Sequence, residues 1–122
     1  MEKIGRGTLV IIGSVAGDRG RKSNYVYGAA KGFIACYVQG LQHRLAHTAV
    51  KIILIKPGPT ATPMTTHLQK KGIRLASVES VAQRIVQALG RKQETVYAPA
   101  YWKIIMQIIQ HIPNSFFKKL NI

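Results

Sequence analysis

The sequence predicts an α/β fold built on a doubly wound parallel sheet, and three observations lead to this prediction. Two β-branched apolar runs, Gly7–Ser14 and Val50–Gly58, are typical of fully buried parallel strands. The segment between them, Ser23–Thr48, carries apolar residues at helical spacing and is long enough for a crossover between parallel strands. A second helical segment and a third short strand then repeat this alternation. We therefore predict about three strands with flanking helices.

The first predicted helix lies within Ser23–Thr48 and should use its apolar residues to cover the sheet. We expect its lone Cys36 to be a small residue of the core. The apolar residues that recur at helical spacing are Ala30, Phe33, Ile34, Tyr37, Val38, Leu41 and Leu45.

After the second strand, residues Pro57–Gly72 are rich in Pro, Thr and Gly, and they predict a long loop of the kind that often carries function. Ser77 has the character of an N-cap for a helix that runs to about Leu89 and stops at Gly90. A short strand is expected around Thr95–Ala98, where Pro99 ends it. The remaining tail should begin as a helix and break near Pro113.

Composition bounds the classes of protein to which the chain can belong. With 122 residues, 47% of them hydrophobic, the chain is long enough for one domain and is neither a disordered tract nor a membrane bundle. No apolar run approaches the length of a spanning helix. The single Cys36 excludes an internal disulfide framework and fits a reducing cytoplasm.

The net charge of +14 favours an anionic partner, such as nucleic acid, a phosphate-bearing cofactor or an acidic lipid surface. The basic residues are scattered along the chain and are not interleaved with exposed aromatic residues, so we do not expect a nucleic-acid reader. His43 and His47 lie four residues apart, but no carboxylate or cysteine completes a site with them. We therefore predict no metal.

Tyr27 and Lys31 are the strongest candidates for chemistry. They lie four residues apart, so a helix places them on one face. A neighbouring ammonium lowers the pKa of a phenol from its usual value of about 10 toward the working range. Ser14 follows a predicted strand, at the sheet rim where ligands bind, although a serine there also serves as a cap. Tyr25 lies six residues from Lys31, off its helical face. This arrangement predicts protonation of a carbonyl oxygen during delivery of a hydride.

The spacing Ser14–x12–Tyr27–x3–Lys31, within "IIGSVAG" and "YGAAK", closely resembles the short-chain dehydrogenase/reductase family. The later "PGPTATPM" (Pro57–Met64) resembles the loop with which this family borders the nicotinamide. The resemblance implies a Rossmann-like fold, of which the chain would be the C-terminal half. It also implies carbonyl/alcohol interconversion with NADP or NAD as cofactor. The basic surplus slightly favours NADP.

The resemblance also implies a role for each matching residue. Tyr27 would be the general acid/base, Lys31 would lower its pKa and hydrogen-bond the nicotinamide ribose, and Ser14 would hold the substrate oxygen. The substrate would be a small-molecule or lipid-like carbonyl or alcohol, and intact relatives usually form homo-oligomers through the helix with Tyr27 and Lys31. The nicotinamide end would be lined by Pro57, Gly58, Thr60 through its backbone and Thr62 through its hydroxyl.

The glycine-rich loop that holds dinucleotide phosphates in this family has no counterpart in the sequence. We therefore expect residues 1–100 to be the second half of an NAD(P)-binding domain, truncated and inactive alone, with an amphipathic tail over 101–122. The tail would dock on a partner subunit or pocket, or would lie on a membrane surface, so we expect a cytoplasmic protein that is peripheral to the membrane at most. The alternative function is a non-catalytic interaction or membrane-surface fragment that uses the basic surface and the apolar tail.

Overall fold

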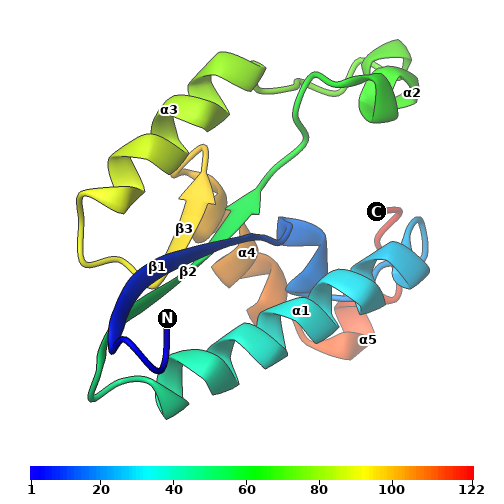
Figure 1. Cartoon of the computed structure of the whole chain (residues 1–122). Helices are drawn as coiled ribbons and strands as arrows, with labels where there is room; N and C mark the ends of the chain where they lie inside the picture. Colours follow the sequence, from blue (N-terminus) through cyan, green and yellow to red (C-terminus); the bar gives the residue numbers. More distant parts are fainter.

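The computed structural model describes all 122 residues and confirms the predicted fold class. Three parallel strands form one sheet in the order β1-β2-β3, with helices on both of its faces (Figure 1). The strands are β1 (Arg6–Ile12), β2 (Ala49–Pro57) and β3 (Thr95–Ala98). The helices are η1 (Val15–Gly17), α1 (Tyr25–Arg44), η2 (Pro63–Thr65), α2 (Thr66–Lys70), α3 (Val78–Leu89), α4 (Trp102–His111) and α5 (Asn114–Phe117).

The central strand β2 divides the core into two layers. Successive side chains of a strand point to opposite faces, so β2 supplies both layers in alternation. Ile53 and Ile55 pack with residues of α3 and β3 on one face. On the other face, Val50, Ile52 and Leu54 pack with Ala35 and Val38 of α1. The continuous apolar run of β2 therefore reflects burial on both faces, as predicted.

Strand β1 departs from the prediction of full burial. It pairs only with β2, so its other edge carries no strand, and Leu9 and Ile12 are 39% and 48% exposed. Its apolar pattern is that of a strand with neighbours on both sides, whereas in this structure it is an edge strand.

Helix α1 forms as predicted, but only one side of its apolar surface meets the sheet. Val38 is buried, and Ile34, Leu41 and Leu45 pack around it. Phe33 is 72% exposed, and Tyr37, Ala30 and Cys36 are also exposed, so the expectation of a buried Cys36 is wrong. The reason is that α1 has apolar residues around most of its circumference, while the sheet covers one side.

The segment predicted as a long loop contains two short helices, η2 and α2. Thr62 and Thr65 form a reciprocal capping box at the start of η2, which gives the threonine-rich sequence local structure. Farther along the chain, the Ser77 hydroxyl accepts a hydrogen bond from the Ser80 amide and α3 stops at Gly90, as predicted. The tail breaks at Pro113, between α4 and α5, as predicted. None of the helices combines the length and apolar content needed to cross a bilayer.

Glycine at two positions lets η1 lie directly on the first turns of α1. A Cβ at Gly17 would come within 2.6 Å of the Lys31 carbonyl carbon, and a Cβ at Gly28 within 2.9 Å of the Ala16 oxygen. Real side chains do not tolerate such approaches to backbone, so both positions require glycine. The contact fixes the segment that follows β1 against the helix that carries Tyr27.

We predict that Gly17→Ala lowers the free energy of unfolding by about 1–3 kcal/mol, because the added methyl must push η1 away from α1. The control is Gly40→Ala, near the C-terminal end of α1, where a Cβ would meet nothing within 4 Å. This control should gain up to about 1 kcal/mol from helix propensity. Urea unfolding measures both variants. Wild-type stability in Gly17→Ala would contradict the close approach.

Candidate functional site

Ser14, Tyr27 and Lys31 come together at the carboxyl end of β1. Ser14 is the N-cap residue of η1, two residues beyond the end of the strand. Tyr27 and Lys31 lie on the first turns of α1, against which η1 packs. The Lys31 ammonium donates a hydrogen bond of 3.2 Å to the Ile12 carbonyl, the last of β1. The fold therefore gathers the three predicted catalytic residues at one rim of the sheet.

The polar groups of these three residues differ in how many hydrogen bonds they make within the chain. The Ser14 hydroxyl accepts a 3.1 Å hydrogen bond from the Ala16 amide, so the capping role also exists. The Lys31 nitrogen lies 5.8 Å from the centre of the Tyr27 ring. Tyr27 is 39% exposed, and no hydrogen bond joins its hydroxyl to Ser14 or to any other residue. Lys31 uses one of its three N–H donors on Ile12, which leaves two for a ligand.

The residues predicted to line the nicotinamide end follow β2 at the same rim. Because β1 and β2 are parallel, Ile12 pairs with Ile55, and the Gly13 amide donates to the Ile55 carbonyl at 2.7 Å. Pro57 ends β2, and Gly58 follows it with its amide bonded to Ala98 of β3. The Trp102 indole occupies the space where a Cβ of Gly58 would lie, which explains a glycine at this position.

The threonines of this segment mainly hold the segment itself. The Thr60 hydroxyl donates to the Gly58 carbonyl at 2.9 Å, and the Thr60 carbonyl accepts from Thr65, so the Thr60 amide remains for other contacts. The Thr62 hydroxyl lies 3.5 Å from that of Thr65. Thr65, which the sequence analysis missed, is buried, and its hydroxyl bonds to the carbonyls of Thr60 and Thr62. The capping-box spacing of Thr62 and Thr65 was the signal that could have identified it.

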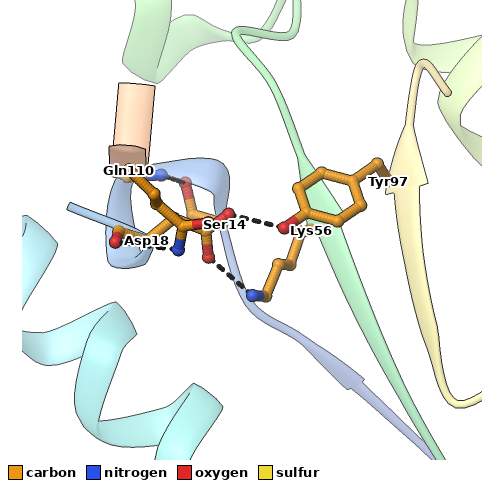
Figure 2. A network of polar contacts seen from close by, with 6 residues as sticks. Ser14, Asp18, Lys56, Tyr97 and Gln110 are labelled. Atoms are coloured by element: carbon orange, nitrogen blue, oxygen red, sulfur yellow. Dashed lines mark hydrogen bonds and ion pairs between the residues drawn. The ribbon is translucent and has the colours of Figure 1, made fainter. Parts of the chain in front are cut away.

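A buried polar network that lies next to the rim was also not predicted from the sequence. The Asp18 carboxylate contacts the Lys56 ammonium at 2.5 Å and accepts a 2.6 Å hydrogen bond from the Tyr97 hydroxyl. Figure 2 shows these side chains converging beside Ser14, and Gln110 of α4 donates to the Asp18 carbonyl. Lys56, within the apolar run of β2, was the available signal, since a charge in a buried strand needs a partner.

The network keeps Tyr97 in its neutral form. Burial of the phenol raises the pKa of Tyr97 well above its ordinary value, and the hydrogen bond to Asp18 and the charge of that carboxylate raise it further. Tyr97 therefore acts as a hydrogen-bond donor to Asp18, and it is distinct from the proton-transfer candidate Tyr27.

Arg19 fastens the tail to the segment that follows Ser14. Its guanidinium donates to the carbonyls of Ile109 and Ile112, each at 2.6 Å, at the carboxyl end of α4. It also donates to the Asn114 side chain and lies 3.8 Å from the centre of the Phe117 ring. A cation is favoured at the negative end of a helix. Arg19 thus joins the segment after Ser14 to the tail.

A hollow of about 570 Å³ opens beside Tyr27 at the start of α1. Its wall includes the Asn24 side chain, whose Oδ1 is buried without a hydrogen-bond partner. The lining residues are Lys22, Ser23, Asn24, Tyr25, Val26, Tyr27 and Ala30. The hollow thus offers mainly apolar walls next to the candidate acid. No three His, Cys, Asp or Glu side chains gather in a metal-binding group.

We predict that Tyr97→Phe lowers the free energy of unfolding by about 1.5–3 kcal/mol at neutral pH, through loss of a hydrogen bond to a charged group. Because the folded-state pKa of Tyr97 is raised, its contribution is complete below the ordinary tyrosine pKa of about 10 and is lost as the pH rises above that value. The gap between wild type and variant should therefore narrow above about pH 10.

Urea unfolding between about pH 9 and pH 11 measures this gap. Tyr25→Phe is the control, because Tyr25 is 66% exposed, and it should follow the wild type throughout. A gap for Tyr97→Phe that stays constant with pH would show that the phenol is not held neutral by the network.

Known proteins that are similar to this chain are dehydrogenases and oxidoreductases. The short chain dehydrogenase family model matches residues 1–73. An uncharacterized oxidoreductase of Streptomyces coelicolor is 31% identical over 121 residues, covering 98% of this chain and 47% of that protein. Another, of Mycobacterium tuberculosis, is 30% identical over 120 residues, covering 98% and 48%. The chain therefore spans about half the length of these curated relatives.

Two solved structures show the same fold. A short chain dehydrogenase from Burkholderia cenocepacia in complex with NADP superposes with a TM-score of 0.80 at 20% identity, covering 96% of this chain and 50% of that one. A short-chain dehydrogenase from Sphingobium yanoikuyae in complex with NADPH gives 0.69 at 22% identity, covering 93% and 48%. Since the family model covers more than half of the chain and the curated relatives align along nearly all of it, the chain belongs to the short-chain dehydrogenase/reductase family.

Proposed function

We propose that the chain carries the proton-transfer part of an NAD(P)-dependent oxidoreductase that interconverts a carbonyl and an alcohol. The observation that supports this most is the position of Lys31. Its ammonium is held at the last carbonyl of β1 while it lies 5.8 Å from the Tyr27 ring. This places a fixed cation next to an exposed phenol at the rim of the sheet where α/β folds bind ligands.

In this proposal Tyr27 donates its hydroxyl proton to the substrate oxygen during reduction and takes a proton back during oxidation. Lys31 stabilises the phenolate that forms, and Ser14 donates its hydroxyl hydrogen to the same substrate oxygen. The Ser14 oxygen accepts from Ala16, so its own hydrogen is available for this contact. The cofactor supplies the hydride when it is bound.

The free donors at the rim fit the nicotinamide–ribose end of NADP or NAD. Two N–H groups of Lys31 are available for ribose oxygens. The segment Pro57–Thr62, which follows β2 at the same edge of the sheet, offers backbone groups and the Thr62 hydroxyl. That segment has no charged side chain for the phosphates. We therefore propose that the isolated chain is inactive and holds the dinucleotide weakly, with NADP preferred slightly because of the net charge of +14.

The substrate we propose is a small or lipid-like carbonyl compound or alcohol that enters the hollow beside Tyr27. The apolar walls of Tyr25, Val26 and Ala30 suit a hydrocarbon group. In this scheme residues 1–100 form the partial catalytic domain and 101–122 a separate tail. The free thiol of Cys36 is compatible with a cytoplasmic location.

We also propose that intact enzymes of this type pair through α1. Val26, Phe33 and Tyr37 are 73%, 72% and 60% exposed, and no charged residue occurs between Gly32 and Gln42. These three residues recur at helical spacing, so they share one face, and an uncharged apolar face of this length suits another helix.

The role of Tyr27 can be tested in a hybrid enzyme, in which this chain replaces the segment that it matches in the NADP-bound Burkholderia cenocepacia relative. We expect Tyr27→Phe to lower kcat for carbonyl reduction by about 10²–10⁴-fold, the usual contribution of a general acid. NADPH binding should change little, because the ring remains. Tyr25→Phe is the matched control and should keep wild-type kcat.

Absorbance of NADPH during ketone reduction gives the rate, and titration calorimetry gives the cofactor affinity. If Tyr27→Phe and Tyr25→Phe reduce kcat equally, Tyr27 is not the acid. An equal loss of cofactor affinity and of kcat/KM in Tyr27→Phe would assign the residue to binding alone.

Pairing through α1 predicts that Phe33→Arg raises the dimer dissociation constant of the hybrid by at least about 30-fold, since a charge would enter an apolar contact. Sedimentation velocity at several concentrations measures this. Val86→Arg on α3 is the control, because Val86 is also exposed, at 67%. Equal weakening by both variants, or none, would contradict pairing through α1.

A further inference from the structure

The tail presents large apolar side chains to solvent although its inner side already packs on the body of the protein. Met106 is buried, and Trp102 lies against Gly58. On the outer side, Ile104 and Ile108 are 63% and 62% exposed and lie four residues apart, one turn above the other. Phe116, after the break at Pro113, is 64% exposed. We call this set, with Lys103, Lys118, Lys119 and Leu120, the tail surface.

The tail surface is held in a fixed orientation. Arg19 binds the end of α4 through the Ile109 and Ile112 carbonyls and packs on the ring of Phe117 in α5. Gln110 adds a hydrogen bond to the Asp18 carbonyl. Because Phe117 takes the inward contact, the neighbouring Phe116 faces outward. The exposed apolar residues are therefore displayed by an anchored structure and are not the result of a loose end.

The charged side chains of the tail itself have one sign. Residues 95–122 contain Lys103, Lys118 and Lys119 and no aspartate or glutamate. Elsewhere, two of the four acidic residues of the chain are already paired, Asp18 with buried Lys56 and Glu2 with Arg44. A surface that combines exposed apolar side chains, flanking lysines and no acids matches an anionic lipid surface, where acyl chains take the apolar groups and headgroups take the cations.

Other occupants fit these features less well. Nucleic acid would satisfy the lysines but has no apolar layer for Ile104, Ile108 and Phe116. A second copy docked through the same surface would bring the lysines of two tails together with no acidic residue of residues 95–122 to pair with them. We propose that the tail surface binds the interface of an anionic bilayer, with Ile104, Ile108 and Phe116 inserted and the lysines at the headgroups. This proposal does not depend on the reaction proposed for Tyr27.

The test is flotation of the purified 122-residue chain with vesicles of pure phosphatidylcholine and with vesicles that contain about one third phosphatidylglycerol. We expect binding to the anionic vesicles and much weaker binding to the neutral ones. Lys118→Glu with Lys119→Glu should lower the partition coefficient by at least about 30-fold, from about 1 kcal/mol per lysine. Ile104→Ser with Ile108→Ser should lower it by at least about tenfold.

Matched controls separate the tail surface from the general charge of the chain. Lys70→Glu with Lys71→Glu makes the same charge change at exposed positions of another segment. Val86→Ser with Leu89→Ser removes exposed apolar side chains from α3. Both controls should keep most of the binding, and circular dichroism confirms that each variant is folded. If Ile104→Ser with Ile108→Ser does not fold, the comparison of Lys118→Glu with Lys119→Glu against Lys70→Glu with Lys71→Glu still tests the proposal.

Binding that falls with the tail variants and persists in the controls supports the proposal. Three results would overturn it. These are no binding to anionic vesicles, equal losses in the tail and control lysine variants, and binding to neutral vesicles as strong as to anionic ones. Equal losses would mean that the charge of the whole chain acts without the tail.

Discussion

The ion pair between Asp18 and Lys56 is the contact on which the site depends. Asp18 belongs to the segment that follows β1, while Lys56 is the penultimate residue of β2 and lies beside the predicted nicotinamide segment. The pair is almost completely buried, and Tyr97 of β3 satisfies the second carboxylate oxygen. Loss of one partner from such a pair typically costs about 3–5 kcal/mol, because a charge remains buried alone. The contact thus ties together the ends of all three strands.

Around that contact, small residues and one arginine determine the arrangement of the rim. Gly17 lets η1 approach the backbone of α1, which brings Ser14 to the turn that carries Lys31. Gly58 makes room for Trp102, so the start of α4 covers the segment after β2. Arg19 then donates hydrogen bonds to the carbonyls at the carboxyl end of α4. Catalytic candidates that a helix and the segment after a strand support in this way are held more precisely than on a free loop.

Local sequence patterns predict the helices and strands of this fold well. They predict less well which side chains are buried and which residues contact one another across the fold. The β-branched runs predicted β1 and β2, and Ser77, Gly90 and Pro113 marked helix ends because caps and breakers act within one turn. The four-residue spacing predicted that Tyr27 and Lys31 would share one face of a helix, and the Lys31 nitrogen lies 5.8 Å from the centre of the Tyr27 ring. By contrast, Cys36 was expected in the core and is exposed, and Phe33, one of the apolar residues at helical spacing, is also exposed. Periodicity does not determine which side of an apolar helix is covered. The partners of Lys56 come from sequence positions 38 and 41 residues away, and no local pattern encodes them.

The proposal that these residues form the proton-transfer end of a dinucleotide site, with weak hold on the phosphates, is tested most directly by thermal unfolding of the purified chain over a range of NADPH concentrations. We expect the unfolding midpoint to stay constant up to NADPH concentrations that saturate intact dehydrogenases, because weak binding stabilises a folded chain only when the ligand concentration approaches its dissociation constant. A midpoint that already rises at those concentrations would show firm binding to the folded chain and would contradict the proposal.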